Sequence, residues 1–352
     1  AEPMPREAPT DGDTRLRWRV VGDDGRNGQQ RLFEHEDGWQ RGRGELAGLE
    51  LLYVRGKRVI NRVHEASRQP FRWTVNPYRG CSHACVYCFA RPTHEYLGLG
   101  IGDDFDRRIV VKINAPERAR AELAAPGWRG ESVALGTNTD PYQPCEKRFG
   151  LTRGVLDALA DAGNPFSVLT KSPLILRDMD VLARGAARAE VMTALSVGTL
   201  DRTVWRATEP KAPDPRRRLE AVARLNQAGV PCGVLIAPVL PGLSDSEESL
   251  RQVVRGAVAA GATSIEAVML HLRPGVRQHY LGWLWRRHPH LAGAYQRRYR
   301  DRSYGPAEER RRLRRLVAAL VDDEGGATAR TRLGGRAGGR DGNVSEPLRE
   351  AV

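Results

Sequence analysis

The chain has 352 residues, with 56 Lys and Arg against 43 Asp and Glu and five Cys, and this length suits one large α/β domain or two small ones. Five scattered cysteines exclude a disulfide framework, and their odd number fits a reducing compartment in which thiols stay free to hold a metal or do chemistry. Because no run of about 18 apolar residues is free of charge, and residues 1–17 lack the apolar core of a signal peptide, we expect a cytoplasmic protein without a membrane span.

Residues 1–48 are rich in charged residues, Gly and Gln and show no sustained hydrophobic period. A segment of this composition buries little apolar surface. We therefore expect a peripheral, partly disordered N-terminal segment.

Between residues 49 and 275, a strand pattern and a helix pattern alternate. Strand followed by helix, repeated six times, implies a parallel sheet, either an open doubly wound sheet or a partial six-unit β/α barrel. In both architectures ligands bind at the carboxyl ends of the strands. The six β-rich runs are residues 71–75, 133–135, 166–169, 191–195, 234–236 and 264–269.

Most of these runs are followed by a helix whose ends are marked by capping residues. Ser, Thr and Asp favour helix N-termini, Pro favours the first turn, and Gly favours the position after the last turn. The predicted helix limits are Thr152 and Gly163, then Asp214-Pro215 and Gly229, then a capping box of Ser244 with Glu247 and Gly261.

Residues 276–321 form a basic, aromatic stretch that we expect to be helical, with Gly305-Pro306 starting its last helix. From Arg277 to Arg315 the net charge is +9. This stretch is either a DNA or RNA surface, because Arg neutralises phosphates and aromatic rings stack on bases, or a solvated helix face. The interleaved aromatic residues include Trp283, Trp285, Tyr295, Tyr299 and Tyr304. Residues 322–352 are Gly-rich and polar, and we expect a disordered tail there.

Three cysteines, Cys81, Cys85 and Cys88, lie within eight residues directly after the first predicted strand. Thiolates at this spacing can converge on one centre and select an iron–sulfur cluster, zinc or Cu(I). Structural zinc needs four ligands, so His83 or His94 would have to supply the fourth. An iron–sulfur cubane held by three cysteines instead leaves one iron open to a small ligand, as catalysis requires.

The Cys-x3-Cys-x2-Cys spacing, with Tyr87 just before the third cysteine, resembles the signature of the radical SAM superfamily. The resemblance implies a partial six-unit β/α barrel in which Cys81, Cys85 and Cys88 bind one 4Fe-4S cluster and S-adenosylmethionine (SAM) binds the fourth iron. It also implies that an electron, from a donor such as flavodoxin or ferredoxin, reductively cleaves SAM to a 5'-deoxyadenosyl radical that takes hydrogen from the substrate. By the same resemblance, Tyr87 contacts the adenine.

Further runs resemble the spore photoproduct lyase-like branch, often labelled DNA repair photolyases. These runs are residues 76–81, 87–91, 136–144 and 170–172, and the likeness spans about residues 55–290. By analogy with the polar segments at the strand ends of that family, the resemblance assigns SAM contacts to Thr137, Asn138, Thr139, Asp140, Lys171 and Ser196. Thr, Asn and Asp also stabilise ordinary turns, so these assignments have a structural alternative. Glu209, in a Thr-Glu-Pro turn, is a further candidate.

One departure from that branch concerns the substrate. Spore photoproduct lyases use a cysteine hydrogen donor in the segment that corresponds to residues 136–140, and this chain has none there. Cys145 lies just beyond that segment and is either within reach of the barrel mouth or, as we expect, a bystander in a loop, and Cys232 is typical of a small core residue. The resemblance therefore leaves the substrate open.

These observations favour a radical SAM enzyme of unknown substrate, with nucleic acid the first candidate. The alternative is a nucleic-acid-binding protein with a structural metal or cluster and no SAM chemistry. A third hypothesis directs the radical chemistry at a small molecule or protein and treats the Arg stretch as a solvated face. Three cysteines without a fourth partner favour the enzyme over the structural site.

Overall fold

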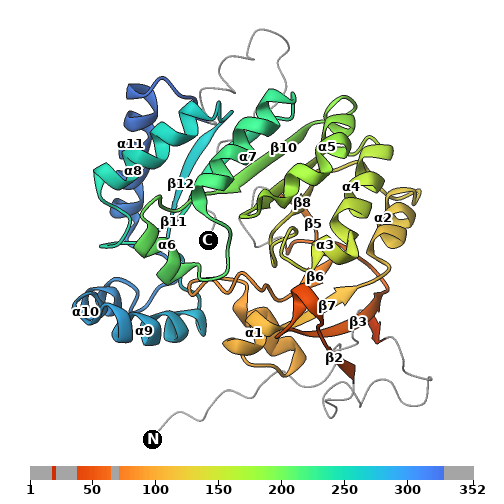
Figure 1. Cartoon of the computed structure of the whole chain (residues 1–352), viewed down its shortest axis with the longest axis horizontal. Coiled ribbons are helices and arrows are strands. Elements are labelled where there is room, and N and C mark those ends of the chain that lie inside the picture. Colours follow the sequence, from red (N-terminus) through yellow and green to blue (C-terminus); the bar gives the residue numbers. More distant parts are fainter. Residues whose placement is uncertain (1–17, 21–37, 65–70, 329–352) are drawn as a thin grey trace, which may run out of the picture.

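The computed structural model describes residues 18–20, 38–64 and 71–328 (Figure 1). Most of the expected N-terminal segment, residues 1–17 and 21–37, lies outside the described residues. The same holds for residues 329–352 of the expected tail.

Six parallel strands form the main sheet, and their order in the sheet is their order in the chain. A short antiparallel strand, β4 (Ile60–Arg62), adds to the outer edge of the first of them. In the described part of the chain β4 and the last strand are the two edges, so the sheet does not close. This arrangement confirms the predicted α/β fold, a partial six-unit β/α barrel. The parallel strands are β5 (Trp73–Val75), β8 (Val133–Leu135), β9 (Phe166–Thr170), β10 (Val191–Ser196), β11 (Cys232–Val239) and β12 (Ile265–Met269).

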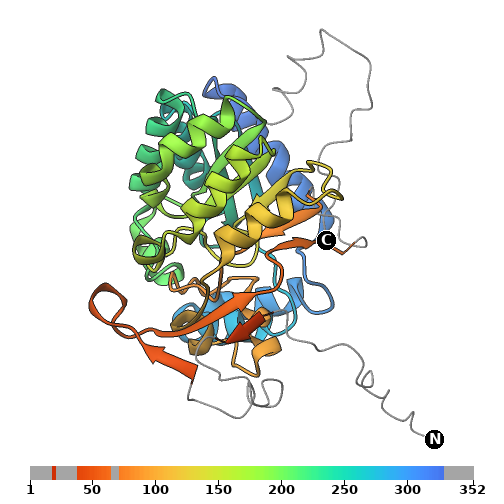
Figure 2. The same ribbon diagram turned by 90° about the vertical axis from the view of Figure 1, so that its right-hand side faces the viewer.

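Amphipathic helices connect the strands and cover the outside of the sheet (Figures 1 and 2). In α4, for example, Val155, Leu156 and Leu159 recur at helical spacing and are buried. The connecting helices are α1 (Asp103–Arg107), α2 (Ala115–Leu123), α3 (Glu146–Phe149), α4 (Leu151–Asp161), α5 (Met179–Ala186), α6 (Arg202–Thr208), α7 (Pro215–Gln227) and α8 (Glu247–Ala259), with the 3-10 helices η3 (Arg91–Leu97) and η4 (Pro173–Asp178).

Two predicted helix starts are wrong. Thr152 lies inside α4, where its hydroxyl donates to Pro141 O at 2.6 Å. The N-cap of α8 is Ser246, whose hydroxyl accepts from Ser249 N, while Ser244 Oγ accepts from Leu240 N in the preceding turn. Ser and Thr hydroxyls can bond either to the first turn of a helix or to the backbone of a neighbouring turn, so sequence spacing alone does not identify the N-cap. The predicted start at Asp214 is confirmed, because its carboxylate accepts from Arg216 N.

A second, smaller sheet was not predicted. It forms around β3, which pairs in parallel with β7 and antiparallel with β1 and β2, and β6 pairs with the far side of β7. Figure 1 shows it beside the main sheet, at the lower right. Because β6 ends two residues before Cys81, this second sheet fixes the start of the segment that carries the cysteines. Its strands are β1 (Trp18–Val20), β2 (Trp39–Arg41), β3 (Glu50–Gly56), β6 (Tyr78–Arg79) and β7 (Arg108–Lys112).

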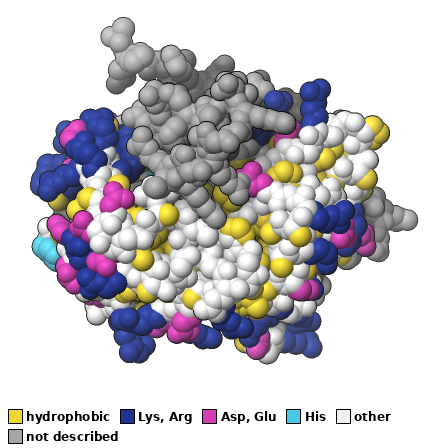
Figure 3. All heavy atoms as spheres, turned by 90° about the horizontal axis from the view of Figure 1, so that it is seen from above, with side chains coloured by type: hydrophobic (Ala, Val, Ile, Leu, Met, Phe, Trp, Pro, Cys, Tyr) yellow, Lys and Arg dark blue, Asp and Glu magenta, His cyan; other side chains and the backbone are white. Residues whose placement is uncertain are grey.

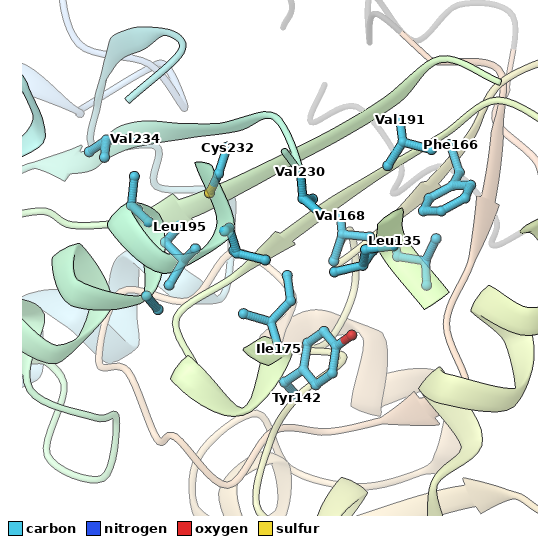
Figure 4. Packing of buried hydrophobic residues seen from close by; sticks show 14 of the residues in the cluster. Leu135, Tyr142, Phe166, Val168, Ile175, Val191, Leu195, Val230, Cys232 and Val234 are labelled. Carbon is cyan, nitrogen blue, oxygen red and sulfur yellow. The ribbon is translucent and has the colours of Figure 1, made fainter. Parts of the chain in front are cut away.

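The largest hydrophobic core fills the space between the main sheet and its helices. Figure 4 shows Phe166, Val168 and Ile175 packed with Leu135 and Leu195 from neighbouring elements. Burial of such side chains contributes about 1.5–3 kcal/mol each. The core thereby fixes the strands whose carboxyl ends carry the polar residues of interest.

Three helices follow the last strand: α9 (Val276–Arg287), α10 (Pro289–Arg298) and α11 (Ala307–Asp323). Helix α11 packs on β12 and α8, whereas α9 and α10 pack on each other close to α1 (Figure 1). The predicted stretch of 276–321 is therefore divided between two places. None of the described helices combines the length and the apolar character needed to cross a membrane.

Candidate functional site

The three clustered cysteines lie on a loop, the cysteine loop (residues 80–91), that folds as successive tight turns. Hydrogen bonds from Ala84 N to Cys81 O and from Cys88 N to Cys85 O, both 3.3 Å long, close two of them. Ala84 has a φ of 56°, a left-handed conformation that costs a residue with a Cβ roughly 1–2 kcal/mol. All three thiols are free; those of Cys81 and Cys85 are buried and that of Cys88 is half-buried. The strained turns thus bring three unbridged thiols into one short loop.

Side chains that follow β8 brace the cysteine loop. Thr139 Oγ1 and Gln143 Nε2 both donate to Gly80 O, at 2.6 and 3.0 Å. Gln143 Oε1 accepts from Ser82 N at 3.1 Å. Gly80 has a φ of 82°, and a Cβ there would lie 2.8 Å from Arg108 O. The shape of the loop therefore depends on a glycine and on two polar side chains of the neighbouring strand end.

Asn76 joins the carboxyl ends of β5 and β8. Its Nδ2 donates to Thr137 Oγ1 at 3.1 Å, and its Oδ1 accepts from Asn138 N at 3.1 Å. Lys112 Nζ donates to Asn76 O at 2.7 Å from the second sheet. The side chain of Thr137 is half-buried and that of Asn138 is exposed. Polar groups thus lie at the sheet edge where ligands bind in α/β folds.

Asp140 is a largely buried carboxylate at the same edge. Its Oδ1 accepts from Thr170 Oγ1 at 2.6 Å, its Oδ2 accepts from Lys171 N at 2.8 Å, and His83 Nδ1 lies 3.4 Å from Oδ2. Burial alone would raise the pKa of Asp140, but His83 and the hydrogen bonds outweigh burial and lower it to about 2. Asp140 therefore ties the cysteine loop to the end of β9.

Replacing Asp140 by asparagine is expected to weaken the acid sensitivity of the fold. The folded-state pKa of about 2 lies below the value of about 3.9 of an unfolded Asp. The stabilisation is therefore present above about pH 4 and is lost as the pH falls toward 2, by about 2 kcal/mol in all. Urea unfolding of the metal-free protein at neutral and acid pH should show a smaller pH-dependent loss in Asp140→Asn than in wild type. An equal loss in both would contradict this role.

Lys171 connects three neighbouring strand ends. Its Nζ donates to Ser196 Oγ at 2.7 Å and to Ala237 O at 3.3 Å, and lies 3.2 Å from Glu209 Oε1. Ser196 Oγ in turn donates to Ala237 O at 2.7 Å. The ammonium also lies 5.7 Å from the centre of the Tyr87 ring, within the range of a cation–π contact. The structure thus brings Tyr87, Lys171 and Ser196 together.

The carboxylate of Glu209 completes this group. It accepts hydrogen bonds from Tyr87 Oη and from Arg218 Nη2. Burial would raise the pKa of Glu209, but Arg218 and Lys171 outweigh burial and lower it to about 2. Glu209 is therefore a buried anion held between two cations.

Sequence reasoning missed Arg218. It is the third of three consecutive arginines, of which Arg216 and Arg217 are exposed while Arg218 is fully buried. Its spacing to Ala221, Val222 and Leu225 places it on the buried face of α7. That helical spacing is a signal in the sequence that would have found it.

The donor set of the cysteine loop fits an iron–sulfur cluster. Burial is the main cause that raises the pKa of each of the three thiols, and the neighbouring thiols Cys85 and Cys88 add to the rise at Cys81. Such thiolates form most readily with a bound cation beside them. Among the described residues, no three His, Cys, Asp or Glu side chains are already arranged to hold a metal ion. The fit therefore lies in the three soft, free donors on one loop.

The two histidines considered as zinc ligands have other partners. His83 faces Asp140. His94 Nε2 lies 2.9 Å from Arg108 O, and its ring packs edge-on against Phe105. Burial lowers the pKa of His94 to about 4. Each histidine thus has a contact within the protein, while the Nδ1 atom of each ring is buried without a hydrogen-bond partner among the described residues.

The remaining two cysteines, Cys145 and Cys232, are fully buried in apolar clusters that do not include the cysteine loop. Cys145 packs with Leu46, Leu49 and Tyr78 in a separate apolar cluster. Cys232 lies in the main core, as expected of a small core residue.

The chain belongs to the radical SAM superfamily. The family model described as "Radical SAM superfamily" matches residues 75–254, half of the chain. This range contains the cysteine loop and the ends of β5, β8, β9 and β10. The protein is therefore a radical SAM enzyme, which decides against the alternative of a binding protein without SAM chemistry.

Among its relatives, an uncharacterized protein of Mycobacterium tuberculosis is 46% identical over 277 residues, which cover 79% of this chain and 82% of that protein. The "Radical SAM Nalpha-GlyT isomerase" of Pseudomonas phage M6 is 25% identical over 192 residues, 53% of this chain and 37% of that one. A mutant spore photoproduct lyase solved with dinucleoside spore photoproduct superposes with a TM-score of 0.56 at 14% identity, over 80% of this chain and 83% of that one. At this identity the structural likeness shows a shared fold.

Proposed function

We propose that Cys81, Cys85 and Cys88 bind one 4Fe-4S cluster and that SAM binds beside it at the carboxyl ends of the parallel strands. The observation that carries this proposal is the cysteine loop, with three free thiols within eight residues directly after β6. When bound, the cluster supplies the electron that reductively cleaves SAM, and the resulting 5'-deoxyadenosyl radical takes hydrogen from the substrate.

In this proposal, side chains at the strand ends and in the cysteine loop bind and orient SAM. Polar groups at the strand ends and the Tyr87 ring make the contacts, and the Lys171 ammonium suits a carboxylate. Thr139 bonds directly to the cysteine loop and Asp140 to the end of β9, so we assign to these two residues the positioning of those segments. The contact residues proposed are Tyr87, Thr137, Asn138, Lys171 and Ser196.

The test is anaerobic reconstitution with iron and sulfide, followed by incubation with SAM and dithionite. Dithionite replaces the natural reductant, for which we propose a flavodoxin or ferredoxin. A brown protein that forms 5'-deoxyadenosine is the expected result. A colourless protein that holds stoichiometric zinc and forms none would overturn the proposal.

We propose further that the substrate is DNA or RNA, bound along α9. The buried face of α9, including Tyr280 and Leu284, packs in one apolar cluster with Cys85 and Tyr87. Near its end, the Trp285 ring is 50% exposed and is followed by two exposed arginines, 286 and 287. Exposed aromatic and guanidinium groups are the ones that stack on bases and neutralise phosphates. The spore photoproduct lyases of similar fold, one of them solved with a dinucleoside photoproduct, support the same class.

Helix α11 offers a weaker surface although it holds many of the arginines. Glu308 pairs with Arg311 and Arg315, and Glu309 pairs with Arg298. On the face seen in Figure 3, Lys and Arg side chains gather at the periphery, interspersed with carboxylates. The positive charge counted along the sequence is thus partly neutralised by ion pairs, and α11 lies along β12 and α8 rather than beside the cysteine loop.

Replacing Arg286 and Arg287 together by glutamine is expected to weaken binding of duplex DNA by about tenfold or more, because two phosphate contacts are lost. The slope of log affinity against log salt should fall in magnitude by about 2. Fluorescence anisotropy of a labelled duplex at several salt concentrations measures both. The matched control is Arg312→Gln with Arg314→Gln, two exposed arginines of α11, which should bind within about twofold of wild type. Equal, small effects of both pairs would instead favour a small molecule or protein as substrate.

A further inference from the structure

We propose that the buried pair Glu209–Arg218 positions Lys171 and Tyr87 beside the cysteine loop and sets the net charge next to Cys85. This inference rests on the proposed function, because its meaning for catalysis requires a cluster at Cys85 and SAM near Lys171.

The segment that carries Glu209 is bonded to the cysteine loop through its backbone. Val86 N donates to Thr208 O at 3.0 Å, and Lys211 N donates to His83 O at 3.2 Å. These two bonds lie on either side of Cys85 in the sequence. Residues 208–211, named the strap, therefore follow the cysteine loop closely, and Glu209 at their centre reaches Tyr87 Oη and Lys171 Nζ.

Arg218 fixes the strap to the barrel. Its Nη1 donates to Ser196 O at 2.9 Å, its Nε donates to Pro213 O at 2.9 Å, and its Nη2 donates to Glu209 and to Pro213 O. A guanidinium holds these donors in one plane, which a lysine ammonium does not. One fully buried side chain of α7 thus fixes the end of β10, the loop before α7 and the carboxylate of Glu209.

Removing ions from water is costly, so a buried ion pair seldom adds net stability over an apolar pair. The Glu209–Arg218 pair is better explained by its effect on the position of neighbouring side chains and on the local charge. Glu209, Lys171 and Arg218 together carry a net charge of +1. Glu209 accepts a hydrogen bond from Tyr87, two residues after Cys85, and the strap that carries Glu209 is bonded to the cysteine loop on both sides of Cys85, so this charge lies next to the loop. Charge and hydrogen bonds near an iron–sulfur cluster set its reduction potential.

The variant that tests this proposal is Glu209→Gln, which keeps the shape of the side chain and removes its charge. The matched control is Glu146→Gln. Glu146 is also buried and also accepts from a tyrosine, Tyr78, and an arginine, Arg177, but it lies in α3, and Tyr78 lies in β6, outside the strap and the cysteine loop. Both variants remove a buried carboxylate, so a general loss of stability should be similar in the two.

The first measurement uses the metal-free protein. Hydrogen exchange at the amides of Val86 and Lys211 should become at least about tenfold faster in Glu209→Gln, because the strap loses its anchor. In Glu146→Gln both amides should exchange as in wild type. Arg218→Lys keeps the positive charge but loses the planar set of guanidinium donors, so it should also speed exchange at both amides. It replaces Glu209→Gln in this measurement if that variant does not fold.

The second measurement uses the reconstituted protein. Glu209→Gln should shift the midpoint potential of the cluster upward, because a negative charge is removed beside it, and should weaken SAM binding by about tenfold or more. Glu146→Gln should leave both unchanged. A redox titration followed by electron paramagnetic resonance, and equilibrium binding of SAM, give the two values.

The proposal is overturned if Glu209→Gln lowers stability as Glu146→Gln does and leaves exchange, potential and SAM affinity at wild-type values. It is also overturned if exchange rises while potential and SAM affinity do not move, because the pair would then be a structural anchor. A wild-type protein that forms no 5'-deoxyadenosine would count against the proposed function, and the exchange measurement would still decide whether Glu209 anchors the strap.

Discussion

Replacing Cys85 by alanine is expected to abolish the formation of 5'-deoxyadenosine. Three thiols are the smallest set that holds a cubane cluster with one open iron, so the loss of one leaves two ligands. Because Cys85 is buried beside Tyr87 in an apolar cluster, alanine fills most of its place and the protein should still fold. Iron and sulfide content after reconstitution, and chromatographic detection of 5'-deoxyadenosine, measure the effect.

The controls are Cys145→Ala and Cys232→Ala. Both thiols are fully buried in apolar clusters away from the cysteine loop. Each variant should lose about 1–2 kcal/mol of stability from the small cavity, while cluster content and 5'-deoxyadenosine stay at wild-type values. Normal activity of Cys85→Ala, or loss of the cluster in both controls, would contradict the proposed ligand set.

Replacing Gly136 by alanine is expected to destabilise the fold by about 3 kcal/mol or more and to disrupt the loop that follows β8. Gly136 has a φ of 90°, and a Cβ there would lie 2.1 Å from Leu169 O, a backbone atom of the neighbouring strand. The strained conformation costs roughly 1–2 kcal/mol, and relieving the contact requires that β8 and β9 move apart. Thr139, three residues on, would then lose its bond to Gly80. Urea unfolding measures the stability.

Gly130→Ala separates the two causes. Gly130 also has a positive φ, of 70°, but a Cβ there would meet nothing within 4 Å. This variant should cost only the conformational part, about 1–2 kcal/mol, and should reconstitute normally. Equal losses in the two glycine variants would show that the contact with Leu169 is relieved at little cost.

The main sheet could be predicted because each strand is a short apolar run and is followed by a helix with recognisable ends. The second sheet could not be predicted in the same way. Residues 108–112 are as apolar as the predicted strands, but β7 pairs with β3, which lies more than fifty residues earlier in the chain. Pairing over such a distance depends on the tertiary fold.

In the candidate site, too, some features could be predicted from local sequence and others depend on the tertiary fold. Cys81, Cys85 and Cys88 lie within eight residues of the sequence, so their spacing alone indicates a common ligand. Glu209 meets Tyr87 and Arg218 only after α6 and α7 have packed against the barrel, and no spacing in the sequence records these contacts. The charge of the C-terminal stretch left two interpretations open, because a sum along the chain does not show which arginines pair with Glu308 and Glu309.

The bonds from Thr139 and Gln143 to the cysteine loop have a consequence for survival in air. They are made entirely by protein groups, so they hold Gly80 and Ser82 in place whether or not iron is present. If the proposed cluster were lost to oxygen, these bonds would still hold the cysteine loop in its shape. Adding iron and sulfide to the folded protein should then restore the cluster without a refolding step.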